Sequence, residues 1–173
     1  MTKLKLGNGD EDGVTMGPLI VDAAADNVVA INEEATAKGA KVMPGGGRSK
    51  LGGSFIEPTI LSGVTNNMRV FREEIFGPVS PLVSFSTEEE AIAIANDTQF
   101  GLAAYFCARD VGRIWRVAEG LEYGIIGINE GIISNAMAPF GGIKESGNGR
   151  EGSKYGLDDY LEIKYLCIGG IDA

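Results

Sequence analysis

The sequence has no histidine, only two cysteines and fewer basic than acidic residues, and each shortage excludes a class of function. Histidine is the commonest general base and metal ligand, so its absence argues against a metal site. Cys107 and Cys167 form neither a zinc-ligand spacing nor a disulfide framework. With 15 Lys and Arg against 24 Asp and Glu, the formal charge is −9. Nucleic acids and anionic membranes both need a basic face, so neither is expected as a partner.

The sequence also lacks the long apolar runs of membrane and secreted proteins. No run approaches the roughly 18 residues of a membrane span, and residues 2–13 lack the apolar centre of a signal peptide. We therefore expect a soluble protein of a reducing compartment, the cytoplasm. Its 173 residues, 44% apolar and 23% charged, suit one globular domain with an appendage.

Helical and strand-like patterns alternate along most of the chain. Apolar spacing predicts helices over 21–38, after Thr87 and after Asp110. Glycine-rich residues 44–53 predict an exposed loop. Strands are predicted over 40–43, 55–61, 79–85, 102–107 and 123–128. This alternation is typical of an α/β fold with a largely parallel sheet flanked by helices.

Polar residues next to these helices predict where the helices begin and end. Asp22 and Asp110 stand where an N-cap is needed, and Gly39 follows the first helix. Thr87 and Glu90 have the spacing of a capping box, in which the hydroxyl and the carboxylate satisfy backbone N–H groups. Pro58 predicts an edge or irregular position in its strand.

The last segment has a different pattern. Residues 157–168 alternate apolar and mixed side chains, which predicts a long strand that leaves the main body and pairs elsewhere. Cys107 and Cys167 both fall inside predicted apolar strands, without a basic neighbour to depress the thiol pKa. We therefore interpret both as buried structural cysteines rather than nucleophiles.

Two short motifs match functional patterns but have the wrong surroundings. Residues 147–152 satisfy GxGxxG, yet no apolar strand precedes them and too little chain follows for a βαβ unit. Residues 8–13 begin like a calcium loop, but Leu19 stands where a bidentate glutamate is required. We interpret the second motif as a solvated acidic turn.

Three polar, glycine-containing stretches remain as candidate sites. Residues 72–78 place two carboxylates beside an aromatic ring and a Gly-Pro turn, an arrangement that can hold a sugar diol. Residues 124–142 run from an apolar strand into a polar loop, where α/β proteins build ligand sites. Residues 144–151 form a dense polar loop. Each stretch taken alone has an equally good structural explanation.

Together these stretches resemble the aldehyde dehydrogenase superfamily, in the same order and with similar spacing. The resemblance rests on EEIFGPV, FGLAAYF, APFGGIKESGNGRE and YGLDDYLEIKY, and NEGIIS followed by REGSKYG is most similar to succinate-semialdehyde dehydrogenases. It implies the C-terminal part of the catalytic domain over residues 1–157 and an oligomerisation strand over 158–173. The family's catalytic cysteine motif has no counterpart here.

The resemblance also implies roles for individual residues. Glu74 would bind the nicotinamide ribose, while Phe76 and Leu102 would contact the cofactor. Phe140 would form the aromatic wall of the aldehyde tunnel and Ser134 would meet the distal carboxylate of the substrate. The same resemblance implies a proton relay at Glu151 and a part in shaping the substrate loop for Asn129.

The resemblance predicts NAD or NADP as the cofactor of the complete enzyme, without tight binding to this chain alone. It predicts a small aldehyde as substrate, a homo-oligomer, and no turnover by this chain by itself. Two alternatives stay open. The chain could be a non-catalytic assembly module whose terminal strand adds to a neighbour's sheet, or part of an aldehyde dehydrogenase with another substrate, since a serine in a glycine-flanked loop also serves as a turn residue.

Overall fold

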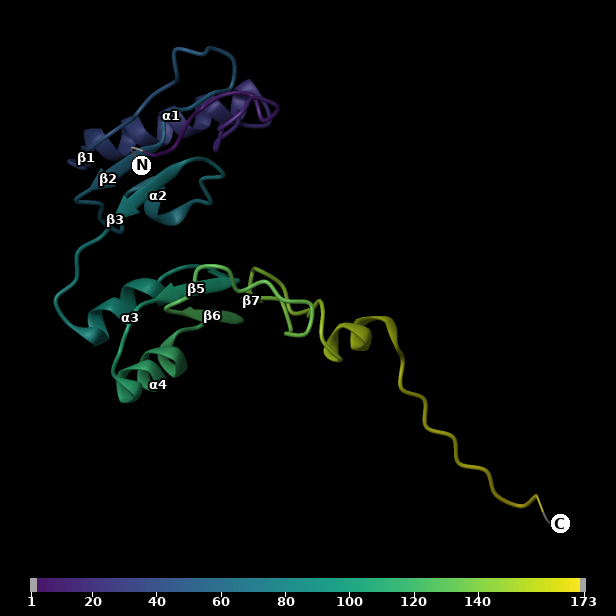
Figure 1. The fold of residues 1–173 in the computed structure, drawn as a ribbon. Coiled ribbons are helices and arrows are strands. Elements are labelled where there is room, and N and C mark those ends of the chain that lie inside the picture. The colour runs from purple at the N-terminus through teal and green to yellow at the C-terminus, as the bar shows by residue number, and fades with distance from the viewer. Residues whose placement is uncertain (1–2, 172–173) are drawn as a thin grey trace. The chain divides into compact units, whose positions relative to one another are not determined.

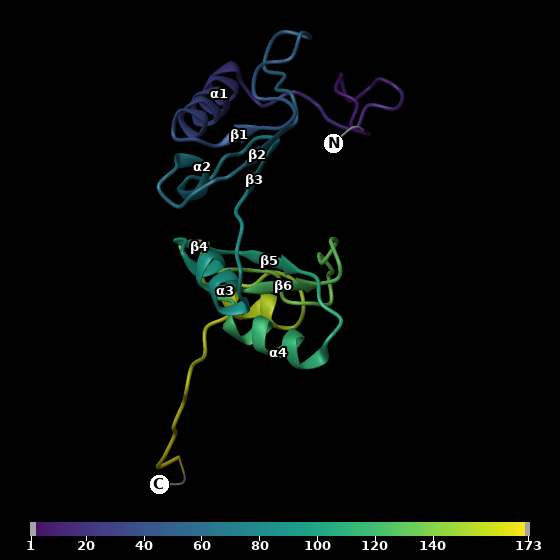
Figure 2. The same ribbon diagram turned by 90° about the vertical axis from the view of Figure 1, so that its left-hand side faces the viewer.

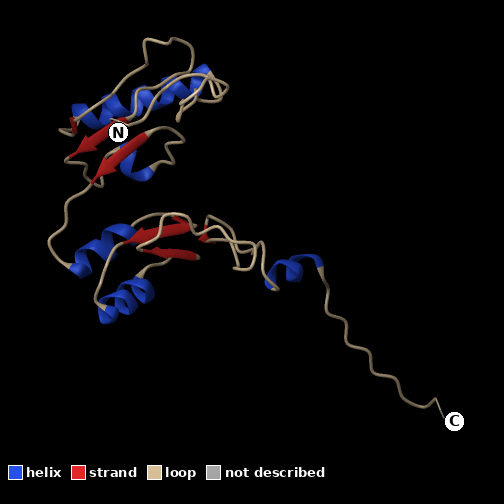
Figure 3. Ribbon diagram, viewed as in Figure 1, coloured by secondary structure: helices blue, strands red, loops and turns tan. Residues whose placement is uncertain are grey.

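The computed structural model describes residues 3–171, which fall into two compact units that meet between Phe85 and Ser86 in the sequence (Figure 1). Both units combine helices with short strands, as Figure 3 shows by colour. The predicted α/β class is confirmed. Within the described residues, no helix has both the length and the apolar character needed to cross a membrane. The predicted boundary at residues 157 and 158 stays a prediction.

The first unit is a three-stranded sheet with helices. Its strands have the order β1-β2-β3, with β1 antiparallel to β2 and β2 parallel to β3. Residue pairs such as Thr59 with Val79 and Ser62 with Leu82 set the parallel register. The elements are α1 (Asp22–Ala37), β1 (Lys41–Val42), β2 (Thr59–Ser62), α2 (Arg69–Arg72) and β3 (Val79–Leu82).

The core of the first unit lies between α1 and the sheet. Ile31 and Ala35 on α1 pack with Leu61 of β2 and with Met68 before α2, and all four are almost fully buried. Val28 and Ala25, about one and two turns before Ile31, belong to a second buried cluster. These positions lie on one face of α1, so the spacing of apolar residues in the sequence identifies the face of the helix that packs against the core.

The ends of α1 confirm one predicted cap and correct the other. Gly39 follows the C-cap with φ of 103°, a left-handed conformation that glycine adopts without strain. The predicted N-cap at Asp22 is wrong, because Val21 occupies the N-cap and no side chain caps it. Asp22 is the first helical residue, and its carboxylate instead lies 3.4 Å from the Arg48 guanidinium.

The second unit contains two separate strand pairs. β4 and β7 are antiparallel, whereas β5 and β6 are parallel, and Figure 2 shows the helices α3 and α4 beside them. The parallel pairs β2–β3 and β5–β6 support the predicted parallel character, with β1 and β7 as antiparallel additions. The elements are α3 (Glu88–Asn96), β4 (Phe100–Gly101), β5 (Ala103–Phe106), α4 (Val111–Gly120), β6 (Ile125–Ile128), β7 (Ile143–Lys144) and a 3₁₀ helix (Tyr155–Tyr160).

Both predicted caps in the second unit are confirmed. The Glu90 N–H donates to Thr87 Oγ1 at 3.1 Å, and the Glu90 carboxylate accepts from the Ser86 N–H at 2.7 Å. The Arg113 N–H donates to Asp110 Oδ1 at 2.7 Å. A carboxylate near a helix N-terminus also interacts favourably with the helix dipole.

The strand predictions are correct in place but too long. The strand predicted over 55–61 begins only at Thr59, directly after Pro58, because proline cannot donate to a sheet ladder. β2 is moreover the central strand of its sheet, so the edge position suggested by Pro58 is wrong. Residues 44–53 form a loop, with Gly45 and Gly46 at positive φ, as predicted.

The structure corrects the predicted burial of the two cysteines and the start of the predicted terminal strand, whereas the pairing of that strand with another sheet stays a prediction. Residues 155–160 form a 3₁₀ helix, and residues 161–170 are extended and paired with no strand among the described residues. Side chains there are exposed, including Ile163 and Tyr165. Cys107, just after β5, and Cys167, in the terminal segment, are both exposed. Apolar alternation therefore does not guarantee burial when a strand has no partner in its own chain.

Candidate functional site

A pocket of about 610 Å³ in the second unit brings three of the predicted site residues together. Leu102, Phe140 and Glu151 all line it, although they are far apart in the sequence. The other lining residues are Gly141, Gly142, Ser146, Gly149, Arg150, Gly152, Gly156, Asp159 and Tyr160. The pocket thus combines an aromatic ring, an aliphatic side chain, carboxylates and backbone polar groups. Such a mixture is typical of small-molecule sites.

The paired backbone of Phe140 and Glu151 places the aromatic ring beside the carboxylate. The Phe140 N–H donates to Glu151 O at 2.8 Å, and the Glu151 N–H donates to Phe140 O at 2.7 Å. Residues that exchange both hydrogen bonds in an antiparallel bridge lie directly opposite each other, with side chains on the same face. The ring and the carboxylate therefore share one side of the pocket wall.

Glycines allow the strands and loops around the pocket to approach closely. A Cβ on Gly124 would lie 2.0 Å from Gly141 O, and one on Gly141 would lie 2.2 Å from Gly149 O. A Cβ on Gly142 would meet the Cβ of Ser146 at 2.5 Å. Any side chain at these positions would displace backbone, so the glycines of this segment are required by packing.

Polar side chains hold this glycine-rich wall against its scaffold. Ser146 Oγ accepts a hydrogen bond from the Gly101 N–H at 3.0 Å, at the end of β4. Lys144 in β7 donates to the carbonyl of Asn96 at 3.1 Å and pairs with the Glu122 carboxylate at 2.6 Å. Together these contacts tie β7 to β4, to the C-terminal end of α3 and to the turn after α4.

A half-buried tyrosine, Tyr123, completes the scaffold. The Tyr123 hydroxyl donates to the carbonyl of Ala95 at 2.6 Å, which joins the start of β6 to α3. Burial raises the pKa of Tyr123, and the nearby Lys144 ammonium partly opposes that shift. The hydroxyl therefore stays protonated at neutral pH and acts as a hydrogen-bond donor.

Arg150 and Asp159 are pocket residues that sequence reasoning assigned no role. Arg150 Nη1 donates to the carbonyls of Gly142 at 2.7 Å, Gly149 at 2.9 Å and Asn148 at 3.2 Å. The Asp159 carboxylate accepts from the Arg150 N–H at 3.3 Å, which links the 3₁₀ helix to the loop. The sequence did show many charged residues over 144–151. A loop has no helical or strand periodicity, however, so the sequence does not predict which carbonyls the Arg150 guanidinium contacts.

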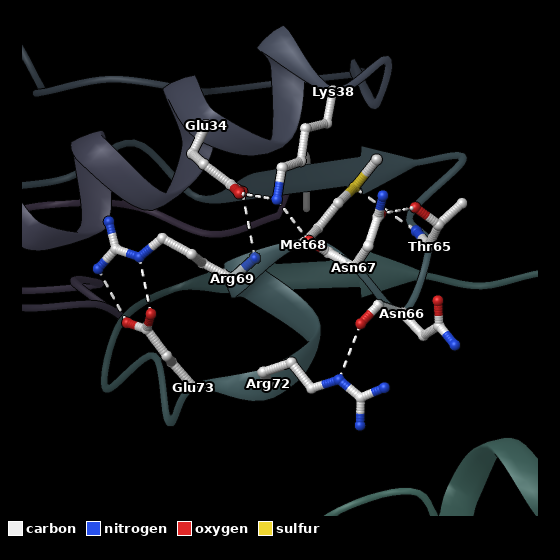
Figure 4. A network of polar contacts seen from close by, with 9 residues as sticks. All are labelled: Glu34, Lys38, Thr65, Asn66, Asn67, Met68, Arg69, Arg72 and Glu73. Atoms are coloured by element: carbon white, nitrogen blue, oxygen red, sulfur yellow. Dashed lines mark hydrogen bonds and ion pairs between the residues drawn. The ribbon is translucent and has the colours of Figure 1, made fainter.

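Glu74 and Phe76 lie in the first unit, just after α2. Arg69 on α2 forms two hydrogen bonds with the Glu73 carboxylate, at 2.7 and 2.8 Å, and its N–H donates to Glu34 on α1 (Figure 4). The Arg69 guanidinium holds the pKa of the Glu73 carboxyl below its usual value. The chain that leaves this anchored turn exposes the next carboxylate, Glu74.

The Phe76 ring is presented to solvent by an unusual backbone. Its φ is 47°, in the left-handed region that non-glycine residues rarely adopt, and its side chain is 78% exposed. Such strain is found where the surroundings and the function require it. The Glu74 carboxylate and the Phe76 ring are therefore both exposed, two residues apart, and their predicted contacts with the cofactor stay a prediction.

Ser134 does not join the pocket. It lies in the loop after β6 with its side chain exposed, and it is not among the residues that line the cavity. Asn129, at the start of the same loop, has φ of 56°, and its amide both accepts from the Ala108 N–H and donates to the Ala108 carbonyl. These two hydrogen bonds anchor the start of the loop to the residues after β5, and the part of Asn129 in shaping the substrate loop stays a prediction.

Comparison with known proteins places this geometry in a family. The model of the aldehyde dehydrogenase family matches residues 1–166, so the chain belongs to the aldehyde dehydrogenase family. The mitochondrial succinate-semialdehyde dehydrogenase of rice is 58% identical over 98% of this chain. The glutarate-semialdehyde dehydrogenase of Pseudomonas aeruginosa is 60% identical over 99% of it.

Solved structures agree with the sequence relatives. The crystal structure of succinate-semialdehyde dehydrogenase from Burkholderia pseudomallei shares 59% identity over 96% of this chain, with a TM-score of 0.93. The matched region is 32% of the rice protein, 35% of the Pseudomonas protein and 35% of the Burkholderia chain. This chain therefore spans about a third of the length of the relatives that it matches.

Proposed function

We propose that this chain is the C-terminal part of an NAD(P)-dependent succinate-semialdehyde dehydrogenase, which oxidises an aldehyde to a carboxylic acid. The observation that supports the proposal most strongly is the shared pocket of Leu102, Phe140 and Glu151. Family resemblance assigns all three to the cofactor and substrate region, and the fold brings Leu102 of one motif together with Phe140 and Glu151 of another. If the short motifs resembled the family only by chance, these three residues would not be expected to line one pocket.

Four of the predicted residues have surroundings that permit the task implied by the resemblance. Phe140 supplies an apolar wall for the substrate chain, and Glu151, on the same face, can accept a proton from water. Glu74 can accept hydrogen bonds from the two ribose hydroxyls, and Phe76 offers a ring for stacking. When bound, the nicotinamide cofactor would supply the hydride acceptor. Ser134 would donate to the distal carboxylate of the substrate.

The nucleophile is not assigned to either cysteine of this chain. Cys107 and Cys167 are exposed, and neither lies among the residues that line the pocket. Loss of one member of a catalytic unit lowers turnover by several orders of magnitude. The purified chain, assayed with NAD or NADP and succinate semialdehyde, should therefore give no turnover above a buffer blank. Turnover that disappears in Glu74→Ala would contradict this prediction.

A hybrid enzyme tests the function itself. In the Burkholderia pseudomallei enzyme, the matched third would be replaced by this chain, and kcat and KM for succinate semialdehyde would be measured. The hybrid should be active, and Glu151→Gln should lower kcat at least tenfold with little change in KM. The matched control is Glu145→Gln, because Glu145 belongs to the same loop but does not line the pocket. A folded, inactive hybrid, or equal losses in both variants, would contradict the proposal.

The choice of substrate rests on Ser134. In the hybrid, Ser134→Ala should raise KM for succinate semialdehyde several-fold and leave KM for an uncharged aldehyde of similar length unchanged. The Pseudomonas relative is named for glutarate semialdehyde, which is one methylene longer, so that aldehyde is the natural competitor in the assay. A lower KM for the longer semialdehyde would favour the alternative of another aldehyde specificity.

The second candidate function is a non-catalytic assembly module. The exposed apolar side chains of residues 161–171 favour it, because they suit addition of a strand to another sheet. A tight complex of the isolated chain with a partner, together with an inactive hybrid, would favour the module over the enzyme.

A further inference from the structure

Two Gly-Asn-Gly sequences occur in this chain, and they have different environments. Asn148 lies between Gly147 and Gly149 in the pocket loop, and Asn8 lies between Gly7 and Gly9 near the start of the first unit. Both asparagines are exposed, so solvent access does not distinguish them. Asparagine is among the least heat-resistant residues of proteins. When the next residue is glycine, no side chain shields the glycine N–H from the asparagine amide.

Asn8 is held in place by its surroundings. Its side-chain amide donates to Glu11 Oε1 at 3.0 Å, its N–H faces the same oxygen at 3.4 Å, and its carbonyl accepts from the Glu11 N–H at 3.0 Å. In this turn the Glu11 carboxylate holds both the side-chain amide and the backbone N–H of Asn8, while the Glu11 N–H holds the Asn8 carbonyl. Rotation of the amide toward the Gly9 nitrogen would break it.

Asn148 has no such restraint. Within residues 3–171, neither the Asn148 amide nor the Gly149 N–H has a hydrogen-bond partner. Its carbonyl oxygen lies 3.2 Å from Arg150 Nη1. That oxygen belongs to the same peptide unit as the Gly149 nitrogen, so the guanidinium stabilises the negative charge that appears when this nitrogen loses its proton.

We propose that Asn148 is a site of spontaneous deamidation in the folded protein, whereas Asn8 is protected. The Gly149 nitrogen loses a proton and attacks Cγ of Asn148, so that an N–Cγ bond forms. The Cγ–Nδ2 bond breaks, and ammonia leaves with the proton. The product is a succinimide ring. Water then adds to one of its two carbonyls, which gives aspartate or isoaspartate without any oxidant or reductant.

The modification changes the pocket wall in two ways. It adds a carboxylate next to Gly149, which lines the pocket together with Glu151 and Asp159, and a Cβ on Gly149 would lie only 2.8 Å from Asp159 Oδ2, so this loop is close to that carboxylate. In isoaspartate the backbone is one carbon longer, which shifts Gly149 relative to Gly141, its close neighbour across the wall. Deamidation is therefore expected to alter the pocket as the protein ages.

The test uses the purified 173-residue chain incubated in neutral buffer, followed over time by peptide mapping and by enzymatic methylation of isoaspartate. The matched control is the same chain in concentrated urea, where both Gly-Asn-Gly segments lose their surroundings. We expect Asn148 to react several-fold faster than Asn8 in the native state and the two rates to converge in urea. Equal native rates, or a faster reaction at Asn8, would overturn the proposal.

Two variants separate the site from its explanation. Asn148→Gln should remove the isoaspartate signal of the pocket loop, because glutamine forms the corresponding ring far more slowly. An undiminished signal in this variant would overturn the assignment. Glu11→Ala should release Asn8 and raise its native rate toward that of Asn148. An unchanged rate at Asn8 would show that the Glu11 contacts do not protect it.

Discussion

The two units of this chain are built on different principles. The largest fully buried side chains, Ile31, Leu61, Met68 and Val28, all belong to the first unit. Within residues 86–171, the buried positions are instead three glycines, Gly101, Gly127 and Gly142. The first unit is held by an apolar core, and the second by close backbone approach and hydrogen bonds. A pocket wall that must present polar groups leaves little room for apolar burial, and such regions have lower local stability.

Substitution of one isoleucine by alanine in each unit should give the largest difference in the free energy of unfolding between the two units. Ile31→Ala removes a fully buried side chain from α1 and should lower the free energy of unfolding of the first unit by about 2–5 kcal/mol. Ile92→Ala, on α3, removes a half-buried side chain and should cost less, about 1 kcal/mol. Hydrogen exchange with mass spectrometry reads the two units separately. Equal losses in both units would contradict the proposed difference.

The local features of both units could be predicted from the sequence. The caps at Thr87 and Asp110 were predicted because each depends on residues only three positions apart. The failed cap at Asp22 shows the limit of such reasoning, since its carboxylate pairs with Arg48, far along the chain. A helix cap predicted from sequence holds only when no distant partner competes for the side chain.

The pocket itself could be predicted only through family resemblance. No periodicity pairs Phe140 with Glu151 or directs Arg150 to the carbonyls of Gly142 and Gly149. These contacts depend on a loop that returns on itself, which composition does not specify. The terminal segment shows the opposite case: its alternation was visible, but the strand that would pair with it is not within residues 3–171. That pairing stays a prediction.

The contact between α3 and α4 gives the second unit a dependence on pH. Glu88 accepts from Arg113 Nε at 2.8 Å and from Arg116 Nε at 2.9 Å, and these guanidinium groups, Arg116 foremost, lower its pKa below the usual 4.5. A carboxyl whose pKa is lowered by folding stabilises the fold above its unfolded pKa, and this contribution is lost as the pH falls through the folded value. The second unit should therefore weaken below pH 4.5.

Trp115, on α4, is the only tryptophan and reports on this unit. The thermal midpoint of its fluorescence should fall between neutral pH and acid, and Glu88→Gln should reduce that fall. Glu119→Gln is the control on α4, the helix that carries both arginines, and it should leave the pH profile unchanged. If the fall is as large in Glu88→Gln as in the unmodified chain, the ion pairs do not carry the pH dependence.

The terminal segment should have the smallest effect on folding and a clear effect on association. Ile163 is fully exposed, so Ile163→Lys should change the free energy of unfolding by no more than about 0.5 kcal/mol. We expect the unmodified chain to self-associate through residues 161–171, since an uncovered apolar strand tends to pair with another chain. Light scattering should then show that Ile163→Lys lowers the average mass, while Lys164→Gln, in the same segment, does not. If the unmodified chain is a monodisperse monomer at high concentration, the expected homo-oligomer is contradicted. The exposed side chains of residues 161–171 then do not mediate self-association.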